Sequence, residues 1–286
     1  SAWLQAASYS GTPAALSGAQ NNSAWSAALS ACDSLDGVTD GLIGNPKACA
    51  FDPAVLQCGA PGASSDPSIC LTAAQVTTMK SFITDLKLQN GTTVLSGYSW
   101  ARGLGQGWGG LGGGFALLAS GDPAWLTPAR QSGFQLESDY YMLGNGLARI
   151  GADHDKAAIA AFITAGKKLI SWHDGSDGLL SPDDHYRNWT TMTGIAKFNG
   201  LADPSSATRF FIVPGAGHSA GSSLQEVDWA GSIMGWVEDG MAPTQMTYTF
   251  KSGATTRSMP VCQYPQYPKY NGTGDINTAA SYSCTS

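Results

Sequence analysis

The stretch KKLISWHDGSDG, residues 167–178, decides the fold class of this chain. Its first half is a short apolar run that ends at Trp172 and predicts a β-strand. Its second half is a loop that holds two acidic residues, Asp174 and Asp177. In open parallel sheets the chemistry gathers at the carboxyl ends of strands. An acid in this place is therefore a candidate for catalysis as well as for a turn.

The segments around this strand continue a regular alternation. Residues 155–165 predict an amphipathic helix before it, and residues 183–191 predict a helix after it. A second strand follows at 209–214, then a loop with a histidine, then a helix over about residues 222–239. Helices and strands that alternate in this way are typical of α/β proteins, so the sequence predicts that class.

The loop after the second strand, PGAGHSAG at residues 214–221, holds a G-x-S-x-G motif with a histidine beside the serine. If Ser219 were the nucleophile of an α/β-hydrolase, the acid and the histidine would have to follow it in the chain. No histidine does, since the four histidines are His154, His173, His185 and His218. Other chain orders occur on unrelated folds, so Ser219 stays as the alternative to His218 as the functional residue of this loop.

Asp177 and His218 suit the last two positions of a Ser…Asp…His triad, because each follows one of two successive strands. Asp177 would accept a hydrogen bond from Nδ1 of His218 and fix its tautomer. Taken singly, a turn aspartate and a loop histidine that caps a helix are the commoner explanations, and only the matched positions favour catalysis. The nucleophile should lie upstream, where Ser99 sits in a glycine loop with no hydrophobic strand before it.

The first half of the chain is less regular. It predicts a helix at about 22–31 and another at 71–86, with Thr72 as the N-cap of the second. Residues 97–121 are so rich in glycine that we expect a loop, in which the two tryptophans could line a cleft. These tryptophans, which could equally be packing residues, are Trp100 and Trp108.

Composition excludes several classes of protein. Charged residues make up only 13% of the 286 residues and the net charge is −6, with no basic run to neutralise phosphates, which argues against nucleic-acid binding. No apolar run reaches the length of a membrane span, and no signal peptide is recognisable. The chain starts at Ser1 without a methionine, which favours a processed product.

The cysteines and the sequons favour secretion. The six cysteines follow one another in near pairs, so the pairing that closes three short loops is the simplest of the fifteen possible pairings. No cluster of cysteines and histidines suggests a zinc site. The pairs are Cys32 with Cys49, Cys58 with Cys70, and Cys262 with Cys284. Four N-x-S/T sequons fit a glycosylated extracellular protein, at Asn21, Asn90, Asn188 and Asn271.

Four stretches together resemble the tannase and feruloyl esterase family, and the likeness covers nearly the whole chain. CDSLDGVTDGLIGNPKACAFDP resembles the calcium loop of that family's lid domain, and VCQYPQYPKYNGTGDINTAASYSC resembles its terminal disulfide segment. KKLISWHDGSDGLLSP and FFIVPGAGHSAG resemble the segments of the catalytic aspartate and histidine. The resemblance implies the carboxyl-terminal part of an α/β-hydrolase fold with an inserted lid. Residues 1–150 would form the lid domain, whose start borders the core, and residues 151–286 would complete the core.

The family implies Asp177 and His218 as triad members and a structural Ca²⁺ in the lid. The ion would be bound by the carboxylates of Asp33, Asp36 and Asp40 and by the carbonyls of Val38 and Leu42. Hard oxygen ligands at short alternating spacing suit Ca²⁺. A bridge between Cys32 and Cys49 would hold this loop closed. Without the family match, a solvated Asp-Gly turn would be the first explanation.

Two features depart from the family. Its members usually carry one cysteine next to the catalytic serine and another next to the histidine, and here Ser219 replaces the second. The part that carries the nucleophilic serine and the oxyanion donors is also missing, so we expect it on a partner chain or on an amino-terminal portion of the same enzyme.

The sequence thus predicts part of a secreted serine esterase that hydrolyses esters of aromatic acids, feruloyl or galloyl. The alternatives are a serine hydrolase that uses Ser219 and a non-catalytic, calcium-stabilised binding homologue.

Overall fold

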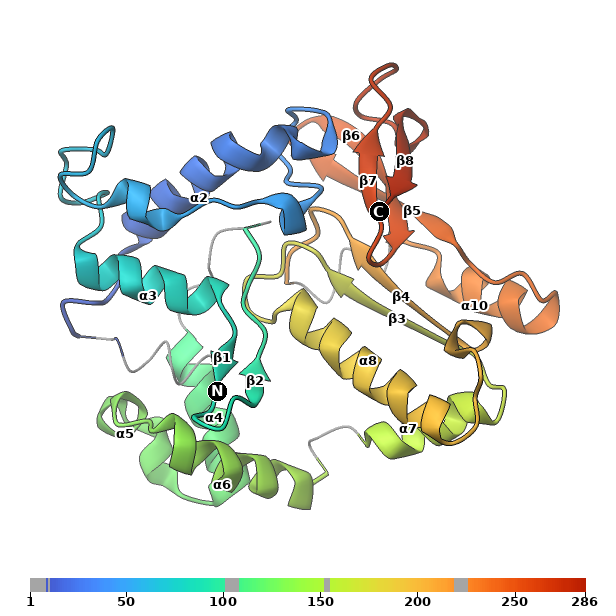
Figure 1. Ribbon diagram of the computed structural model, residues 1–286, viewed down its shortest axis with the longest axis horizontal. Coiled ribbons are helices and arrows are strands. Elements are labelled where there is room, and N and C mark those ends of the chain that lie inside the picture. The colour runs from blue at the N-terminus through green and yellow to red at the C-terminus, as the bar shows by residue number, and fades with distance from the viewer. Residues whose placement is uncertain (1–8, 10, 101–107, 152–154, 219–225) are drawn as a thin grey trace. The chain divides into compact units, whose positions relative to one another are not determined.

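The computed structural model describes residues 9, 11–100, 108–151, 155–218 and 226–286 (Figure 1). The chain divides into two compact units, each described here by itself. The first comprises residues 1–26, 52–98 and 103–154, and the second comprises residues 27–51, 99–102 and 155–286.

The second unit is built on a four-stranded mixed sheet with strand order β3-β4-β6-β5. Strands β3 and β4 are parallel, with Asp174 opposite Val213, while β4–β6 and β6–β5 are antiparallel pairs. The strands are β3 (Leu169–Asp174), β4 (Thr208–Val213), β5 (Gln245–Ser252) and β6 (Thr255–Gln263). The expected strands at 167–172 and 209–214 are confirmed within two residues.

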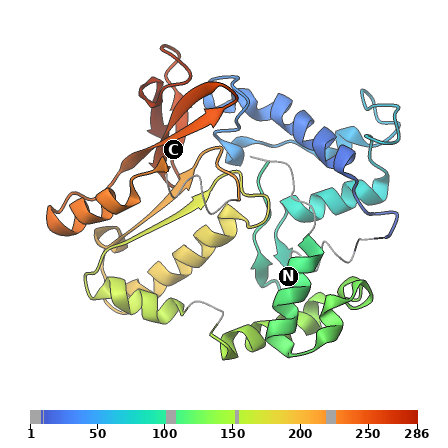
Figure 2. The same cartoon turned by 180° about the vertical axis from the view of Figure 1, so that it is seen from behind.

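Helices pack on both faces of this sheet (Figures 1 and 2). Successive side chains of a strand point to opposite faces, so neighbouring residues of β4 enter different layers. Phe210 packs against Trp189 of the crossover helix, while Phe211 packs against Trp229 on the other side. Among the described residues, the helices that lie wholly within this unit are α7 (Lys156–Thr164), α8 (Pro182–Phe198) and α10 (Trp229–Glu238). The crossover of α8 between parallel strands confirms the α/β class.

A small antiparallel pair follows the sheet at the end of the chain. Strands β7 (Tyr267–Tyr270) and β8 (Tyr282–Thr285) pair with each other, and the Cys262–Cys284 disulfide ties β8 to the end of β6. The sequence predicted a closed tail here but not the long β5–β6 hairpin before it, which places Met246, Tyr248 and Val261 in the core.

The first unit is mainly helical. The first helix among its described residues, α2 (Gly18–Cys32), begins in this unit and ends in the second. Thr72 is the N-cap of α3, as the sequence predicts, and it also forms a capping box with Gln75. The remaining elements are α3 (Ala73–Ile83), β1 (Leu86–Lys87), β2 (Thr93–Leu95), α4 (Trp108–Ser120), α5 (Pro128–Ser132) and α6 (Leu136–Arg149).

The glycine-rich stretch at 97–121 is not a loop throughout, because α4 occupies its second half. Ala116 and Ala119 of α4 are buried in a cluster with Trp125, Phe134 and Leu143. Each glycine weakens a helix by about 1 kcal/mol relative to alanine, and the buried contacts of this face offset that cost. The expectation of a loop was therefore wrong for 108–120, and residues 101–107 lie outside the described residues.

Short 3₁₀ turns link the larger elements. They are η1 (Asp33–Asp36), η2 (Pro46–Ala48), η3 (Pro53–Leu56), η4 (Pro123–Leu126), η5 (Pro204–Ser206) and η6 (Ala279–Ser281). None of the helices in the described ranges is long and apolar enough to cross a membrane.

All six cysteines form disulfides, in the three pairs that the sequence favours. The bridges close loops with sequence separations of 17, 12 and 22 residues. A bridge over a loop of this length stabilises a fold by roughly 3 kcal/mol, mainly by restricting the unfolded chain. Disulfides of this kind are typical of extracellular proteins.

Candidate active site

The loop after β3 brings Asp177 to the carboxyl end of the parallel pair. Two backbone hydrogen bonds fasten this loop to the segment after β4, from Gly175 N–H to Val213 O (2.8 Å) and from Ser176 N–H to Ala216 O (2.8 Å). The approach at Gly175 is close, since a Cβ there would lie 2.9 Å from Ile212 Cγ2 and 3.0 Å from Val213 O. Glycine at this position therefore lets the two loops run side by side.

The carboxylate of Asp177 is buried and hydrogen-bonded through both oxygens. Oδ1 accepts from the backbone N–H groups of Leu179 (2.8 Å) and Leu180 (3.0 Å). Oδ2 lies 2.8 Å from Nδ1 of His218 and 3.3 Å from Nε2 of His173. Burial raises the pKa of Asp177, but the hydrogen bonds from His173, His218 and the two N–H groups together outweigh it and lower the pKa to about 2. The side chain is thus a fixed negative charge at neutral pH.

His218 lies in the turn that follows β4. Gly215, with φ +72°, makes this turn, a conformation that glycine adopts without steric cost. The His218 side chain is 44% exposed, whereas that of Asp177 is 5% exposed. A buried acid that orients an accessible imidazole through Nδ1 leaves Nε2 as the proton acceptor, which is the arrangement of the acid–base half of a serine hydrolase triad.

The structure thus brings together the two residues that the sequence singled out as a pair. Ser219, the alternative nucleophile, lies outside the described residues. Trp100 is buried and donates from Nε1 to Phe51 O (3.2 Å), with its ring edge-on to the Phe51 ring, so it is a packing residue rather than a cleft residue. The side chain of Trp108 lies outside the described part of the chain.

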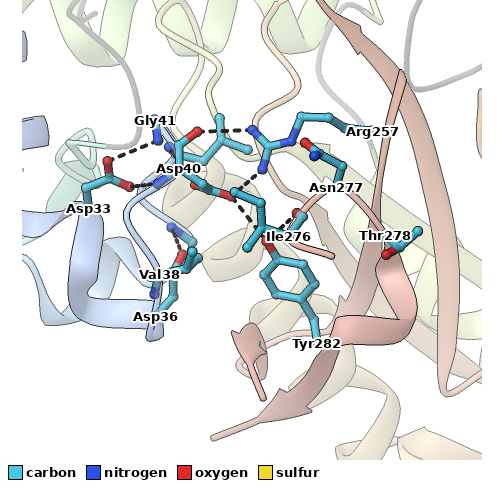
Figure 3. A network of polar contacts seen from close by, with 12 residues as sticks. Asp33, Asp36, Val38, Asp40, Gly41, Arg257, Ile276, Asn277, Thr278 and Tyr282 are labelled. Atoms are coloured by element: carbon cyan, nitrogen blue, oxygen red, sulfur yellow. Dashed lines mark hydrogen bonds and ion pairs between the residues drawn. The ribbon is translucent and has the colours of Figure 1, made fainter. Parts of the chain in front are cut away.

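The acidic loop at residues 33–42 is closed by hydrogen bonds to its own carboxylates (Figure 3). Asp33 accepts from the N–H groups of Asp40 (3.1 Å) and Gly41 (3.0 Å). Asp36 accepts from the N–H groups of Val38 (3.2 Å) and Gly44 (2.9 Å). The Cys32–Cys49 bridge encloses this loop.

Asp40 faces the carboxyl-terminal segment of the second unit instead (Figure 3). Its Oδ2 pairs with the Arg257 guanidinium, which also donates from Nη1 to the Asp40 carbonyl (3.1 Å). The hydroxyl of Tyr282 lies within donating distance of two acceptors, Ile276 O (2.7 Å) and the same Oδ2 (3.2 Å). Burial, followed by the charge of Asp40, raises the pKa of Tyr282, so the hydroxyl stays protonated as a donor.

The carboxylate oxygens of this loop are of the kind that Ca²⁺ prefers as ligands. Asp33 and Asp36 are buried, and burial together with the nearby charges of Asp40 and Asp33 raises the pKa of Asp36 to about 7. Buried like charges of this kind are relieved when a cation binds. Within the described ranges, however, no three His, Cys, Asp or Glu side chains lie close enough together to hold a metal ion. The calcium site with Val38 and Leu42 as carbonyl ligands therefore stays a hypothesis.

Sequence reasoning missed two contacts at these sites. His173 reaches the candidate catalytic carboxylate from four residues upstream, and Arg257 reaches Asp40 from 217 residues downstream. The His173–Asp177 contact had a local signal in the sequence, because a histidine near the end of a strand can contact a residue of the loop that follows. The second depends on a tertiary contact and had no signal in the sequence.

Comparison with known proteins identifies the family of the chain. The sequence profile described as "Tannase and feruloyl esterase" matches residues 1–112 and 150–285. The chain belongs to this family. A mono(2-hydroxyethyl) terephthalate hydrolase from Piscinibacter sakaiensis is 31% identical over 311 residues, covering 90% of this chain and 50% of that protein. A probable feruloyl esterase from Arthroderma benhamiae is 28% identical over 287 residues, covering 90% and 51%.

Solved structures of similar fold come from the same family. Feruloyl esterase B from Aspergillus oryzae matches with a TM-score of 0.74 at 20% identity, covering 99% of this chain and 61% of that chain. Tannin acyl hydrolase from Aspergillus niger matches with a TM-score of 0.71 at 19% identity, covering 99% and 56%. The expected α/β-hydrolase type of fold is thereby confirmed. The chain spans about half the length of the curated relatives it matches.

Proposed function

We propose that this chain is part of a carboxylic ester hydrolase in which Asp177 and His218 are the acid and the base of a Ser-His-Asp triad. The observation that carries the proposal is the 2.8 Å contact between Asp177 Oδ2 and His218 Nδ1, just beyond the ends of two adjacent parallel strands. Membership of a family of esterases gives this contact its chemical interpretation.

In this mechanism His218 accepts the proton of the nucleophilic serine through Nε2 as the serine attacks the ester carbonyl. Asp177 fixes the tautomer and stabilises the imidazolium that forms. The imidazolium then returns the proton to the leaving alcohol, which leaves an acyl-serine. Water hydrolyses the acyl-serine by the same proton transfers in reverse order. The low pKa of Asp177 suits this role, because the carboxylate stays charged while His218 gains and loses its proton.

We place the nucleophilic serine and the oxyanion donors outside these 286 residues, on an amino-terminal portion or a partner chain. Two observations support this placement. The matched relatives are about twice as long as this chain. In addition, β3 is an edge strand among the described strands, although all of its side chains are partly buried. A further parallel strand would satisfy the open edge.

For the substrate we propose esters of aromatic carboxylic acids, of the feruloyl or galloyl type. The names of three matched proteins support this class, since ferulate, terephthalate and the acids of tannins all have an aromatic ring. Secretion is supported by the three disulfides.

The experiment that tests the proposal is labelling of the native, unreduced protein with a fluorophosphonate, followed by peptide mass spectrometry. We expect the label on a serine outside these 286 residues, and no label after His218→Ala. Asp239→Asn, which changes an exposed carboxylate at the end of α10, is the control that should keep the label. A label on Ser219 would assign the reaction to the other serine, and a protein that takes no label with His218 intact would contradict the proposal.

We also propose that the loop at residues 33–42 binds a structural Ca²⁺ through the five residues that the family implies. Thermal unfolding tests it. Calcium should raise the Tm of chelator-treated protein, and the double substitution Asp33→Asn with Asp36→Asn should remove that response. Magnesium at the same concentration is the control, because it does not favour a flexible cage of protein oxygens. An equal Tm with calcium and with chelator would contradict the proposal.

A further inference from the structure

Asp177 has a second histidine on the same oxygen that contacts His218. His173, at the end region of β3, lies with Nε2 3.3 Å from Asp177 Oδ2, and its side chain is only 10% exposed. The triad chemistry proposed above uses a single histidine. The role of His173 therefore needs a separate explanation.

The neighbours of His173 define which of its nitrogens carries the proton. Nε2 faces two groups that can only accept, the Asp177 carboxylate and the carbonyl of Leu180 at 3.3 Å. In the neutral ring Nε2 is therefore the donor and Nδ1 the acceptor. Nδ1 lies 3.0 Å from Nδ1 of His185, so His185 donates to it. The result is a chain of donors that runs from His185 through His173 to Asp177.

His185, the first donor in this series of hydrogen bonds, is held in place by regular secondary structure. His185 lies in the first turn of α8, whose N-cap is Ser181. Its ring is edge-on to Phe210 of β4, with centroids 5.0 Å apart, and edge-on to His173 at 5.2 Å. Both strands and the crossover helix thus fix the direction in which His173 points.

We propose that His173 is a positioning residue for the Asp177–His218 pair and that His185 holds His173 in the donating tautomer. The inference rests on the function proposed above and adds residues to the same site. With two backbone N–H groups on Oδ1 and two imidazoles on Oδ2, the carboxylate cannot rotate without losing several hydrogen bonds at once. Removal of His173 leaves His218, whose side chain is 44% exposed, as the remaining partner of Oδ2 among the described residues.

Proton NMR of the Nδ1–H of His218 reports directly on its hydrogen bond to Asp177. A ring proton that is hydrogen-bonded to a carboxylate resonates far downfield. The signal is assigned by its loss in His218→Ala. In His173→Phe we expect it to move upfield or to broaden through faster exchange with water. In His173→Gln, whose carboxamide can donate from near the position of Nε2, the signal should return. His185→Phe should give a smaller change in the same direction.

Tyr186→Phe is the matched control, because it keeps the ring that packs on Trp189 and Phe210 next to His185. Its His218 signal should equal that of the unchanged protein. A signal unaffected by His173→Phe would overturn the inference, as would an equal change in Tyr186→Phe. If His173→Phe fails to fold, His173→Gln and His185→Phe still decide the matter: the inference is wrong if the signal is lost in the first or unchanged in the second.

Kinetics of the protein as it is produced, with any part outside these 286 residues present, give a second readout. We expect His173→Phe to lower kcat roughly tenfold with little change in KM, because the carboxylate acts on the transition state rather than on substrate binding. A change in KM alone would contradict the positioning role. If the unchanged protein hydrolyses no ester, the proposed function fails, while the NMR signal still decides whether His173 positions the pair.

Discussion

At the scale of single residues, the charge of Asp177 couples the candidate site to stability. Its pKa is lowered from 3.8 to about 2 in the folded protein, so it stabilises the fold above the unfolded pKa, and this contribution is lost as the pH falls through the folded pKa. A shift of this size corresponds to about 2 kcal/mol.

We therefore expect Asp177→Asn to lower the free energy of unfolding by about 2 kcal/mol at neutral pH. The difference from the unchanged protein should shrink between about pH 4 and pH 2. Urea unfolding across this range measures it, with Asp239→Asn as the control for loss of a carboxylate. A difference that stays constant down to pH 2 would show that packing, and not the charge, is responsible.

Substitution of alanine for two glycines of the second unit should have opposite effects on stability. Gly175→Ala places a Cβ 2.9 Å from Ile212 Cγ2 and 3.0 Å from Val213 O, so the Asp177 loop must shift. We expect a loss of roughly 1–3 kcal/mol in the free energy of unfolding, as for overpacking. Gly194→Ala in α8 meets nothing within 4 Å and should instead stabilise the fold by up to about 1 kcal/mol. Chemical denaturation compares the two, and equal effects would rule out the steric explanation.

At the scale of elements, α3 and α4 show what sequence patterns can predict. α3 was predictable because Thr72 and Gln75 make a local capping box. α4 was not, because its glycines point to a loop and its stability comes from packing against η4 and α6. β5 and β6 were missed for a related reason, since their register is defined by pairing with each other and with β4.

The Asp40–Arg257 pair links the acidic loop to β6, and its removal should be costly. The side chain of Asp40 is only 1% exposed and that of Arg257 only 6% exposed, so water solvates neither charge. In the presence of chelator we expect Arg257→Met to lower the free energy of unfolding by about 3 kcal/mol, because Asp40 is left as a buried charge. Adding Asp40→Asn should recover part of this loss, and a double-mutant cycle by urea unfolding measures the coupling. Independent, additive effects would mean that the pair does not hold the loop.

At the scale of the whole molecule, the sequence singled out Asp177 and His218 as a pair but offered no convincing nucleophile to go with them. Asp177 and His218 were recognisable because each follows a strand of a parallel pair, and the order of the chain carries that information. The chain spans about half the length of its curated relatives. If the nucleophile lies outside these 286 residues, as proposed above, no pattern within them can reveal it.

The folded structure shows which of the four sequons are accessible to a glycan, and the sequence alone does not. Asn90 is exposed in the turn between β1 and β2, and Asn271 is exposed just after β7. Asn21 is 8% exposed within α2, and Asn188 lies within α8, where its Nδ2 donates to Asp184 O (3.0 Å). A glycan on either of the last two would displace packed side chains or a helix contact, whereas the turn sites can carry one without change.

Expression in a host that glycosylates sequons should therefore give folded protein with glycans on Asn90 and Asn271 only. Glycopeptide mass spectrometry identifies the sites, and the substitutions Asn90→Gln and Asn271→Gln should together remove the mass added by glycans. Because transfer takes place on the unfolded chain, Asn21 can be reached before folding, and its glycan should then appear in misfolded, retained protein. Folded, secreted protein with a glycan on Asn21 would contradict the packing of α2 described here.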